Sequence, residues 1–97
     1  MVAGLNDVPD ALKAARDRID DIDSRLIALI QERFGVAAGV VEIKRKAGLP
    51  ALLQDRVDEV LDHVEALGRA RGLPEGVARD LWRVLISATI DFENSRL

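Results

Sequence analysis

The 97-residue sequence contains no cysteine and only one histidine, His63. Disulfide frameworks, thiol nucleophiles and ordinary zinc sites are therefore excluded, because each needs residues that the chain lacks. Aromatic residues make up only 3% of the chain, so Leu, Val, Ile and Ala are left to form the core, as is common in all-helical proteins. No apolar run approaches the roughly 20 residues that a membrane-spanning helix needs.

The chain also has no large excess of charge. Its formal net charge is −3 at pH 7, which argues against a general nucleic-acid binder, because such proteins usually carry a basic patch. The stretch "MVAGLNDVPD" lacks the basic start and apolar centre of a signal peptide, so a cytoplasmic location is expected. Because the net charge is negative, any anionic ligand must be bound by a local cluster of cations.

Glycine and proline divide the chain into three helical segments. We expect three helices, from about Pro9 to Ala47, from about Gln54 to Arg71, and from Pro74 to near Leu97. Gly48 suits a C-terminal cap of the first helix. No strand pattern or repeat occurs, so the prediction is an all-α fold with residues 1–97 as one domain. The apolar residues at helical spacing are Leu12, Ala15, Ile19, Ile22, Leu26, Ile30, Ala37 and Val40, then Val57, Val60, Leu61, Val64 and Leu67, then Val77, Leu81, Val84, Leu85, Ala88 and Phe92.

The first helix is too long for one chain of this size to cover. It would extend about 60 Å, which is roughly twice the diameter expected of a compact chain of this length. Either it kinks near Gly35 or Gly39, or a second copy covers its apolar stripe. The stripe continues past both glycines in the same phase, and this favours an intertwined homodimer.

Two cations lie on that apolar stripe. Spacings of four, three and four residues join Arg33, Ala37, Val40 and Lys44, and they place all four on one face of the helix. An unpaired buried cation is costly, so we expect a ligand or a partner's anion to meet Arg33 and Lys44. They lie about 16 Å apart along the helix, near enough for two long side chains to converge on one small ligand.

Other charged residues extend this cluster. Arg16 borders the same stripe, Arg56 begins the second helix directly after a loop, and Glu93 lies near the end of the third. Taken singly, most helical Arg and Lys residues are solvated or paired with neighbours, as we expect of Arg18 and Arg25 beside Asp21. Likewise, we expect His63 at the surface, and Trp82 as a core or interface anchor.

The chemistry available to such a cluster is limited. The sequence offers no Ser–His–Asp or Cys–His set, no glycine-rich phosphate loop and no set of metal ligands. The cations could hold a dianion in one conformation and stabilise negative charge developing on an oxygen. A unimolecular rearrangement of a dicarboxylate would need little more.

The order and spacing of these segments resemble the all-α chorismate mutases from about Leu12 to Glu93. The resemblance includes "ARDRIDDIDSRLIALIQER", in which Arg16 precedes "IDDID" and Arg33 closes the segment. It continues with "IK" ending at Lys44, "GLP" at 48–50, "DRV" at 55–57, "RGLP" at 71–74 and Glu93. Each motif is short, but their order and spacing together carry the resemblance.

The resemblance implies an intertwined dimer of three-helix chains with two equivalent active sites. Such an enzyme converts chorismate to prephenate by a Claisen rearrangement, in the shikimate pathway to aromatic amino acids, without a cofactor. Arg33 and Arg56 would bind the dicarboxylate together with Arg16 of the partner subunit. Lys44 would bind the ether oxygen and a carboxylate, and Glu93 would bind the same ether oxygen from the opposite side. Thr89 matches a hydroxyl residue that lines the family's site.

Two positions depart from the family's usual pattern. Val57 replaces a glutamate that accepts a hydrogen bond from the substrate's ring hydroxyl, and Glu93 replaces a glutamine found in many members. The first change resembles the isochorismate-pyruvate lyases, which share this fold. Both changes together resemble the branch that acts on 4-amino-4-deoxychorismate in antibiotic and aryl-amine pathways. The resemblance therefore leaves three substrates open, and a non-catalytic helical dimerisation or regulatory module is the alternative outside enzymes.

Overall fold

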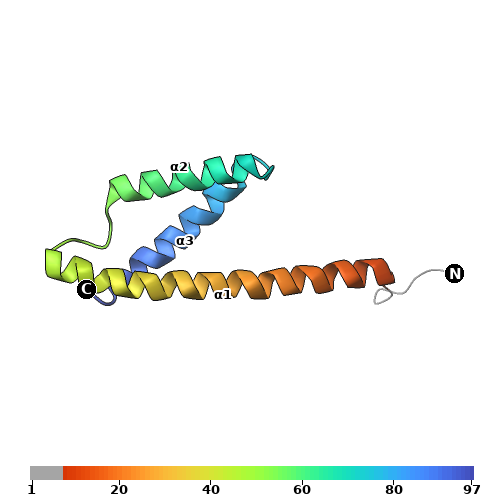
Figure 1. Cartoon of the computed structure of the whole chain (residues 1–97), viewed down its shortest axis with the longest axis horizontal. Coiled ribbons are helices and arrows are strands. Elements are labelled where there is room, and N and C mark those ends of the chain that lie inside the picture. The colour runs from red at the N-terminus through yellow and green to blue at the C-terminus, as the bar shows by residue number, and fades with distance from the viewer. Residues whose placement is uncertain (1–7) are drawn as a thin grey trace. The chain divides into compact units, whose positions relative to one another are not determined.

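The computed structural model describes residues 8–97, and three helices follow one another along this part of the chain (Figure 1). They are α1 (Asp10–Ala47), α2 (Gln54–Ala70) and α3 (Val77–Asn94). Residues 8–97 contain no strand, so the predicted all-α class with a very long first helix is confirmed. The prediction that no signal peptide is present rests on residues 1–10, and most of these lie outside the described residues.

Glycines with positive φ end the first two helices. Gly48, which follows α1, has a φ of 69°, and Gly72, which follows α2, has a φ of 76°. At the first of these ends, the N–H of Leu49 donates to the carbonyl of Lys44 at 2.8 Å, and the N–H of Gly48 donates to that of Arg45 at 3.3 Å. These two bonds form a Schellman cap, in which glycine avoids the steric penalty of a Cβ. The predicted cap at Gly48 is confirmed.

The third helix begins three residues later than the sequence suggested. Pro74 was expected to open it, but α3 begins at Val77. Gly76 occupies the N-cap position with a φ of 84°, and no side chain caps the helix there. Because a left-handed residue cannot belong to a right-handed helix, Pro74 and Glu75 lie in a separate turn before it.

The chain divides into two compact units between Arg33 and Phe34. The buried apolar core lies in the second unit, 34–97, where α3 returns from the α2–α3 turn toward the last turns of α1 (Figure 1). Val41 is only 2% exposed and is the most deeply buried large side chain. The other buried apolar residues are Ala37, Ala51, Leu61, Val64, Ala78 and Ile86.

A glycine lets α2 and α3 approach each other closely. A Cβ added at Gly68 would lie 3.1 Å from the Cβ of Ala78 and 3.6 Å from Cδ1 of Leu73. The two small residues therefore set the separation of the helices at this crossing. Beyond it, Leu61 and Val64 of the predicted α2 face are buried, whereas Leu67 is half exposed.

The face of α3 that packs within the chain differs from the predicted apolar stripe. Leu81 is 59% exposed and Val84 is 72% exposed, although both were assigned to that stripe. The residues of α3 that are buried are Ala78, Ile86, Thr89 and Glu93. Periodicity locates an apolar stripe, but it does not show which neighbour covers that stripe. Two polar residues take core positions on α3 instead.

The first unit, 8–33, consists of the N-terminal part of α1. Its leucine and isoleucine side chains are well exposed to solvent, with Ile19 at 56%, Ile27 at 64% and Leu29 at 61%. The expected pairing of Arg25 with Asp21 is confirmed, with 3.6 Å between Nε and Oδ2. No described helix is long and apolar enough to cross a membrane.

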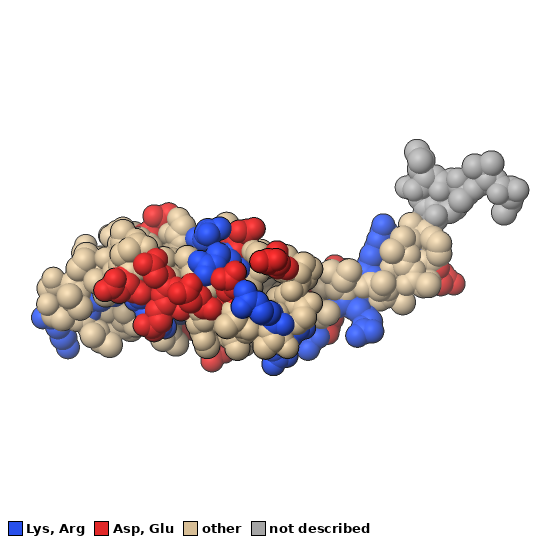
Figure 2. Space-filling model, turned by 90° about the horizontal axis from the view of Figure 1, so that it is seen from above, with Lys and Arg blue, Asp and Glu red and all other residues tan. Residues whose placement is uncertain are grey.

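The outward side of α2 is polar. Its exposed residues include Asp55, Arg56, Asp58, Glu59 and Asp62. Figure 2 shows acidic and basic side chains lying close together on the face that it presents. This side of α2 is therefore solvated, whereas Leu61 and Val64 of the same helix are buried.

Candidate active site

Lys44 of α1 carries a positive charge into the core of the second unit. Its side chain is only 12% exposed. The ammonium Nζ donates to Oε1 of Glu93 at 2.8 Å and to the carbonyl oxygen of Ala51 at 2.7 Å. An ammonium group has three N–H donors, so these two bonds leave one N–H for a ligand.

Glu93 reaches this ammonium from the last turn of α3. Its side chain is 8% exposed, and it lies 49 positions after Lys44 in the chain. Breaking a buried ion pair by removing one partner typically costs about 3–5 kcal/mol, because the remaining charge stays buried without compensation. The sequence analysis expected a ligand or a partner's anion near Lys44, whereas in the structure the anion that meets it is Glu93 of the same chain.

Thr89 lies one turn before Glu93 and is also buried. Its hydroxyl donates to the carbonyl of Leu85 at 2.7 Å, as Ser and Thr often do within helices. Thr89 and Glu93 are thus the two buried polar residues of α3, and Glu93 is the one that contacts Lys44 of α1. No buried side-chain nitrogen or oxygen of the described residues is left without a hydrogen bond.

The predicted residues of α2 lie at its first turn. Arg56 is exposed and forms an ion pair with Glu59, three residues later. Val57 is half-buried and lines an apolar hollow between α2 and α3 together with Leu61, Ile86 and Ile90. A valine in this hollow can contact a ligand's ring but cannot accept a hydrogen bond from it.

The remaining predicted arginines lie on α1 in the first unit. Arg16 is exposed, and Arg33 is half-buried at the end of this unit. In the described part of the chain, no group of three or more His, Asp or Glu side chains could hold a metal ion.

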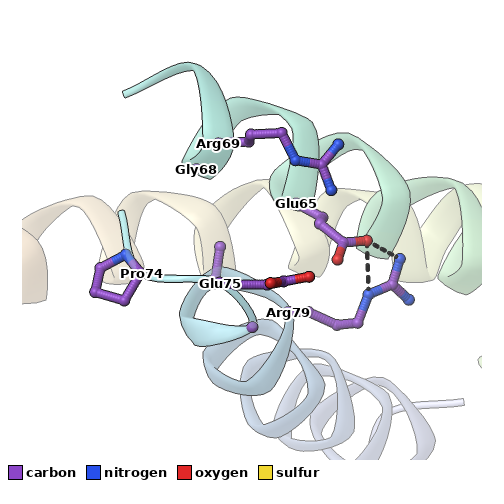
Figure 3. Close-up of a pocket in the computed structure, with 8 residues that line it drawn as sticks. Glu65, Gly68, Arg69, Pro74, Glu75 and Arg79 are labelled. Carbon is purple, nitrogen blue, oxygen red and sulfur yellow. Dashed lines mark hydrogen bonds and ion pairs between the residues drawn. The ribbon is translucent and has the colours of Figure 1, made fainter. Parts of the chain in front are cut away.

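A second hollow lies at the turn between α2 and α3, and Figure 3 shows that it is lined by charges of both signs. Arg79 donates from Nη2 to Glu65 at 2.6 Å and to Asp62 at 2.7 Å. The bond to Glu65, and then the bond to Asp62, raise the pKa of Arg79 above its ordinary value. These ion pairs connect α3 to α2, and none of the predicted site residues lines this hollow.

Comparison with known proteins identifies the family. The profile of chorismate mutase type II matches residues 15–94, which is most of the chain. The chain belongs to the chorismate mutase type II family. The resemblance drawn from the sequence is confirmed, and with it the class of protein, an isomerase of the chorismate mutase type.

Three relatives illustrate how this domain is used. A chorismate mutase of Methanocaldococcus jannaschii is 30% identical over 77 residues, which cover 79% of this chain and 78% of the relative. The T-protein of Enterobacter agglomerans is 31% identical over 85 residues, covering 88% of this chain and 23% of that protein. A bifunctional chorismate mutase/prephenate dehydratase of Aquifex aeolicus is 31% identical over 87 residues, covering 87% of this chain and 24% of that protein. The chain therefore matches about four fifths of one relative's length and about a quarter of the length of the other two.

Sequence reasoning missed one group of this site. The carbonyl of Ala51 holds Lys44, yet a backbone oxygen leaves no mark in the side-chain pattern. The "GLP" turn at 48–50 was the available signal, because it ends α1 and leads the chain back past Lys44.

Proposed function

We propose that this chorismate mutase converts chorismate to prephenate, with Lys44 and Glu93 at the reacting ether. The observation that carries the proposal is the buried contact of 2.8 Å between the Lys44 ammonium and the Glu93 carboxylate. A charged group fixed in a water-poor site stabilises charge in a transition state without reorganising at the moment of reaction.

The reaction asks little more of the protein. In the Claisen rearrangement a C–O bond breaks and a C–C bond forms within one molecule, so no proton, electron or second reactant is added. Negative charge grows on the ether oxygen as the C–O bond breaks. The third N–H of Lys44 can donate to that oxygen, while the core around the ammonium keeps its position fixed.

Arginines would bind the two carboxylates of the substrate. We assign this role to Arg33 and Arg56 of one chain and to Arg16 of the partner subunit, because a guanidinium binds carboxylate oxygens in pairs. Arg56 forms an ion pair with Glu59 in the structure. Because an exposed ion pair of this kind contributes little to stability, a substrate carboxylate can replace the carboxylate of Glu59. Thr89 and Val57 would line the same site.

This assignment requires a homodimer, and we propose one. The exposed apolar side chains of α1, such as Ile19, Ile27 and Leu29, would be covered by a second copy. In this proposal residues 1–97 form a single functional domain. The N-terminal part of each α1 would then bring Arg16 to the other chain's site.

Glu93 favours a second candidate substrate, 4-amino-4-deoxychorismate. Glu93 accepts a hydrogen bond from Lys44, and an ionised carboxylate can only accept. Toward the ether oxygen of chorismate, Glu93 could donate only when protonated, whereas beside an amino substrate its charge would offset the ammonium. Val57 weakens recognition of both the hydroxyl group of chorismate and the amino group of its analogue at C4, so this residue does not decide between the two substrates.

Product analysis tests the proposal directly. The purified protein would be incubated in parallel with chorismate, 4-amino-4-deoxychorismate and isochorismate, and the products separated by chromatography. Prephenate or its amino analogue is the expected product. Release of pyruvate from isochorismate would instead identify a lyase, and no turnover of any substrate would favour a non-catalytic dimerisation or regulatory module.

A further inference from the structure

The residues that follow α3 hold the backbone of Glu93. The N–H groups of Arg96 and Leu97 donate to the carbonyl oxygen of Glu93 at 3.1 and 3.0 Å. The hydroxyl of Ser95 donates to the carbonyl of Phe92 at 2.7 Å. The last turn of α3 is thus fixed by the segment beyond it as well as by the helix before it.

Two contacts connect this segment to α1. Arg45 donates from its guanidinium to the carbonyl oxygen of Arg96. The guanidinium of Arg96 lies 4.3 Å from the centre of the Phe92 ring, and this ring packs edge-to-face on Phe34 with 5.2 Å between centroids. We call Phe34, Arg45, Phe92 and Arg96 the clasp.

Residues of the clasp are direct sequence neighbours of both Lys44 and Glu93. Arg45 directly follows Lys44 on α1, and Phe92 directly precedes Glu93 on α3. Glu93 is one residue from the end of α3, and helix ends open more easily than helix centres. A carboxylate at that place needs a further restraint if it is to hold a buried ammonium in one position.

We propose that the clasp positions the Lys44–Glu93 pair for the rearrangement, with Arg45 and Arg96 as positioning residues. The inference rests on the function proposed for that pair. Neither arginine touches the ammonium or the carboxylate in the contacts above, so each acts through the backbone or through Phe92. A displacement of about 1 Å at a reacting group can lower a rate as much as a hundredfold.

Two substitutions remove different parts of the clasp. Arg96→Ala removes the guanidinium over Phe92 and leaves the backbone carbonyl that Arg45 binds. Arg45→Ala removes the bond to that carbonyl and leaves Lys44 unchanged. We expect each to lower kcat roughly tenfold while KM changes less than about threefold, because positioning for the chemical step is lost rather than substrate binding.

Matched variants separate positioning from a general loss of charge. Arg96→Lys keeps a cation over the Phe92 ring and should retain most of the activity. Arg69→Ala removes an exposed arginine of α2 outside the clasp and should leave kcat as it is. Melting temperatures of all variants show whether any of them has simply unfolded.

A second measurement does not depend on turnover. Acetylation of the three lysines by a water-soluble acylating reagent, followed by mass spectrometry, reports how firmly Lys44 is held. Lys13 and Lys46 are exposed and serve as internal standards. In Arg96→Ala and Arg45→Ala, we expect Lys44 to be acetylated several times faster relative to these standards than in the parent protein.

The outcomes distinguish the two proposals. Unchanged protection of Lys44 in both variants, even with a lower melting temperature, would overturn the clasp as a positioning device. Unchanged kcat in both would do the same. If acetylation of Lys44 accelerates while even the parent protein converts no substrate, the clasp is supported and the proposed function fails.

Discussion

The ammonium of Lys44 lies 2.8 Å from a carboxylate oxygen of Glu93, and both side chains are almost completely buried. The pair joins the long first helix to the last turn of α3. It satisfies the charge of a lysine placed on an apolar stripe, and it leaves one N–H of that lysine for a ligand. Stability and the proposed catalysis therefore depend on the same two residues. The two contributions can be separated experimentally.

The first prediction separates these two contributions. Lys44→Ala should lower turnover by about a hundredfold or more, because a charged contact in the transition state is lost. It should also destabilise the fold by about 3–5 kcal/mol, because Glu93 stays buried without a partner. The double variant Lys44→Met/Glu93→Leu should recover most of the stability but none of the activity. Denaturant titration and initial rates test both parts, with Lys46→Ala as an exposed control.

The second prediction concerns residue 93. A glutamine amide can donate a hydrogen bond at any ordinary pH, whereas a glutamate donates only when protonated. Glu93→Gln should therefore shift the preference toward chorismate. Steady-state kinetics of both proteins on chorismate and its amino analogue provide the test. An unchanged preference would mean that residue 93 does not touch the ether oxygen.

The third prediction concerns Arg16 across the dimer. Arg16→Ala and Arg33→Ala should each give folded, nearly inactive protein. If Arg16 acts in the partner's site, mixing the two variants should restore part of the activity after subunit exchange, since each mixed dimer carries one intact site. Exchange can be followed with differently tagged chains. Verified exchange without recovery would place both arginines in the site of their own chain.

The fourth prediction is that the protein assembles as a homodimer whose separated chain is not stable. Leucine and isoleucine side chains of α1 are exposed in the single chain, with Ile27 at 64%. Ile27→Asp should weaken the dimer and lower the melting temperature together, because folding and association are linked. Sedimentation equilibrium at micromolar concentration measures the assembly, and Asp23→Ala at an exposed polar position is the control. A folded, active monomer of the parent protein would contradict this prediction.

The fifth prediction concerns the crossing of α2 and α3. Gly68→Ala should destabilise the protein by about 1–3 kcal/mol, because the new methyl group would lie 3.1 Å from the Cβ of Ala78. Adding Ala78→Gly should relieve that contact, so the double variant should be more stable than the sum of the two single changes predicts. Thermal unfolding of the four proteins measures the coupling, and strict additivity would show that the two residues do not constrain each other.

The sequence predicted those features that depend on neighbouring residues. The end of α1 followed from Gly48, and the outward place of Arg25 followed from Asp21 four residues before it. The family resemblance then selected Lys44, Thr89 and Glu93 as residues of one site. The structure joins Lys44 to Glu93 and buries Thr89 one turn before Glu93. The roles of the arginines stay predictions.

Features that depend on long-range packing could not be predicted in the same way. Lys44 and Glu93 are 49 positions apart, and no periodicity links two different helices. The same limit explains why Leu81 and Val84, on the apolar stripe of α3, are exposed in the single chain while Thr89 and Glu93 are buried. Nor could the start of α3 be placed correctly, because the positive φ of Gly76 is a property of the folded turn.

The loop after α1 binds Lys44 twice. Leu49 donates its N–H to the carbonyl of Lys44, and the carbonyl of Ala51 accepts from the same residue's ammonium. Both contacts use backbone atoms of the loop, so they depend on the number of residues between them more than on which residues these are. Natural variation at 49–52 should therefore favour substitution over insertion or deletion. An engineer who wished to graft a tag or a reporter into this surface turn would displace the ammonium by doing so.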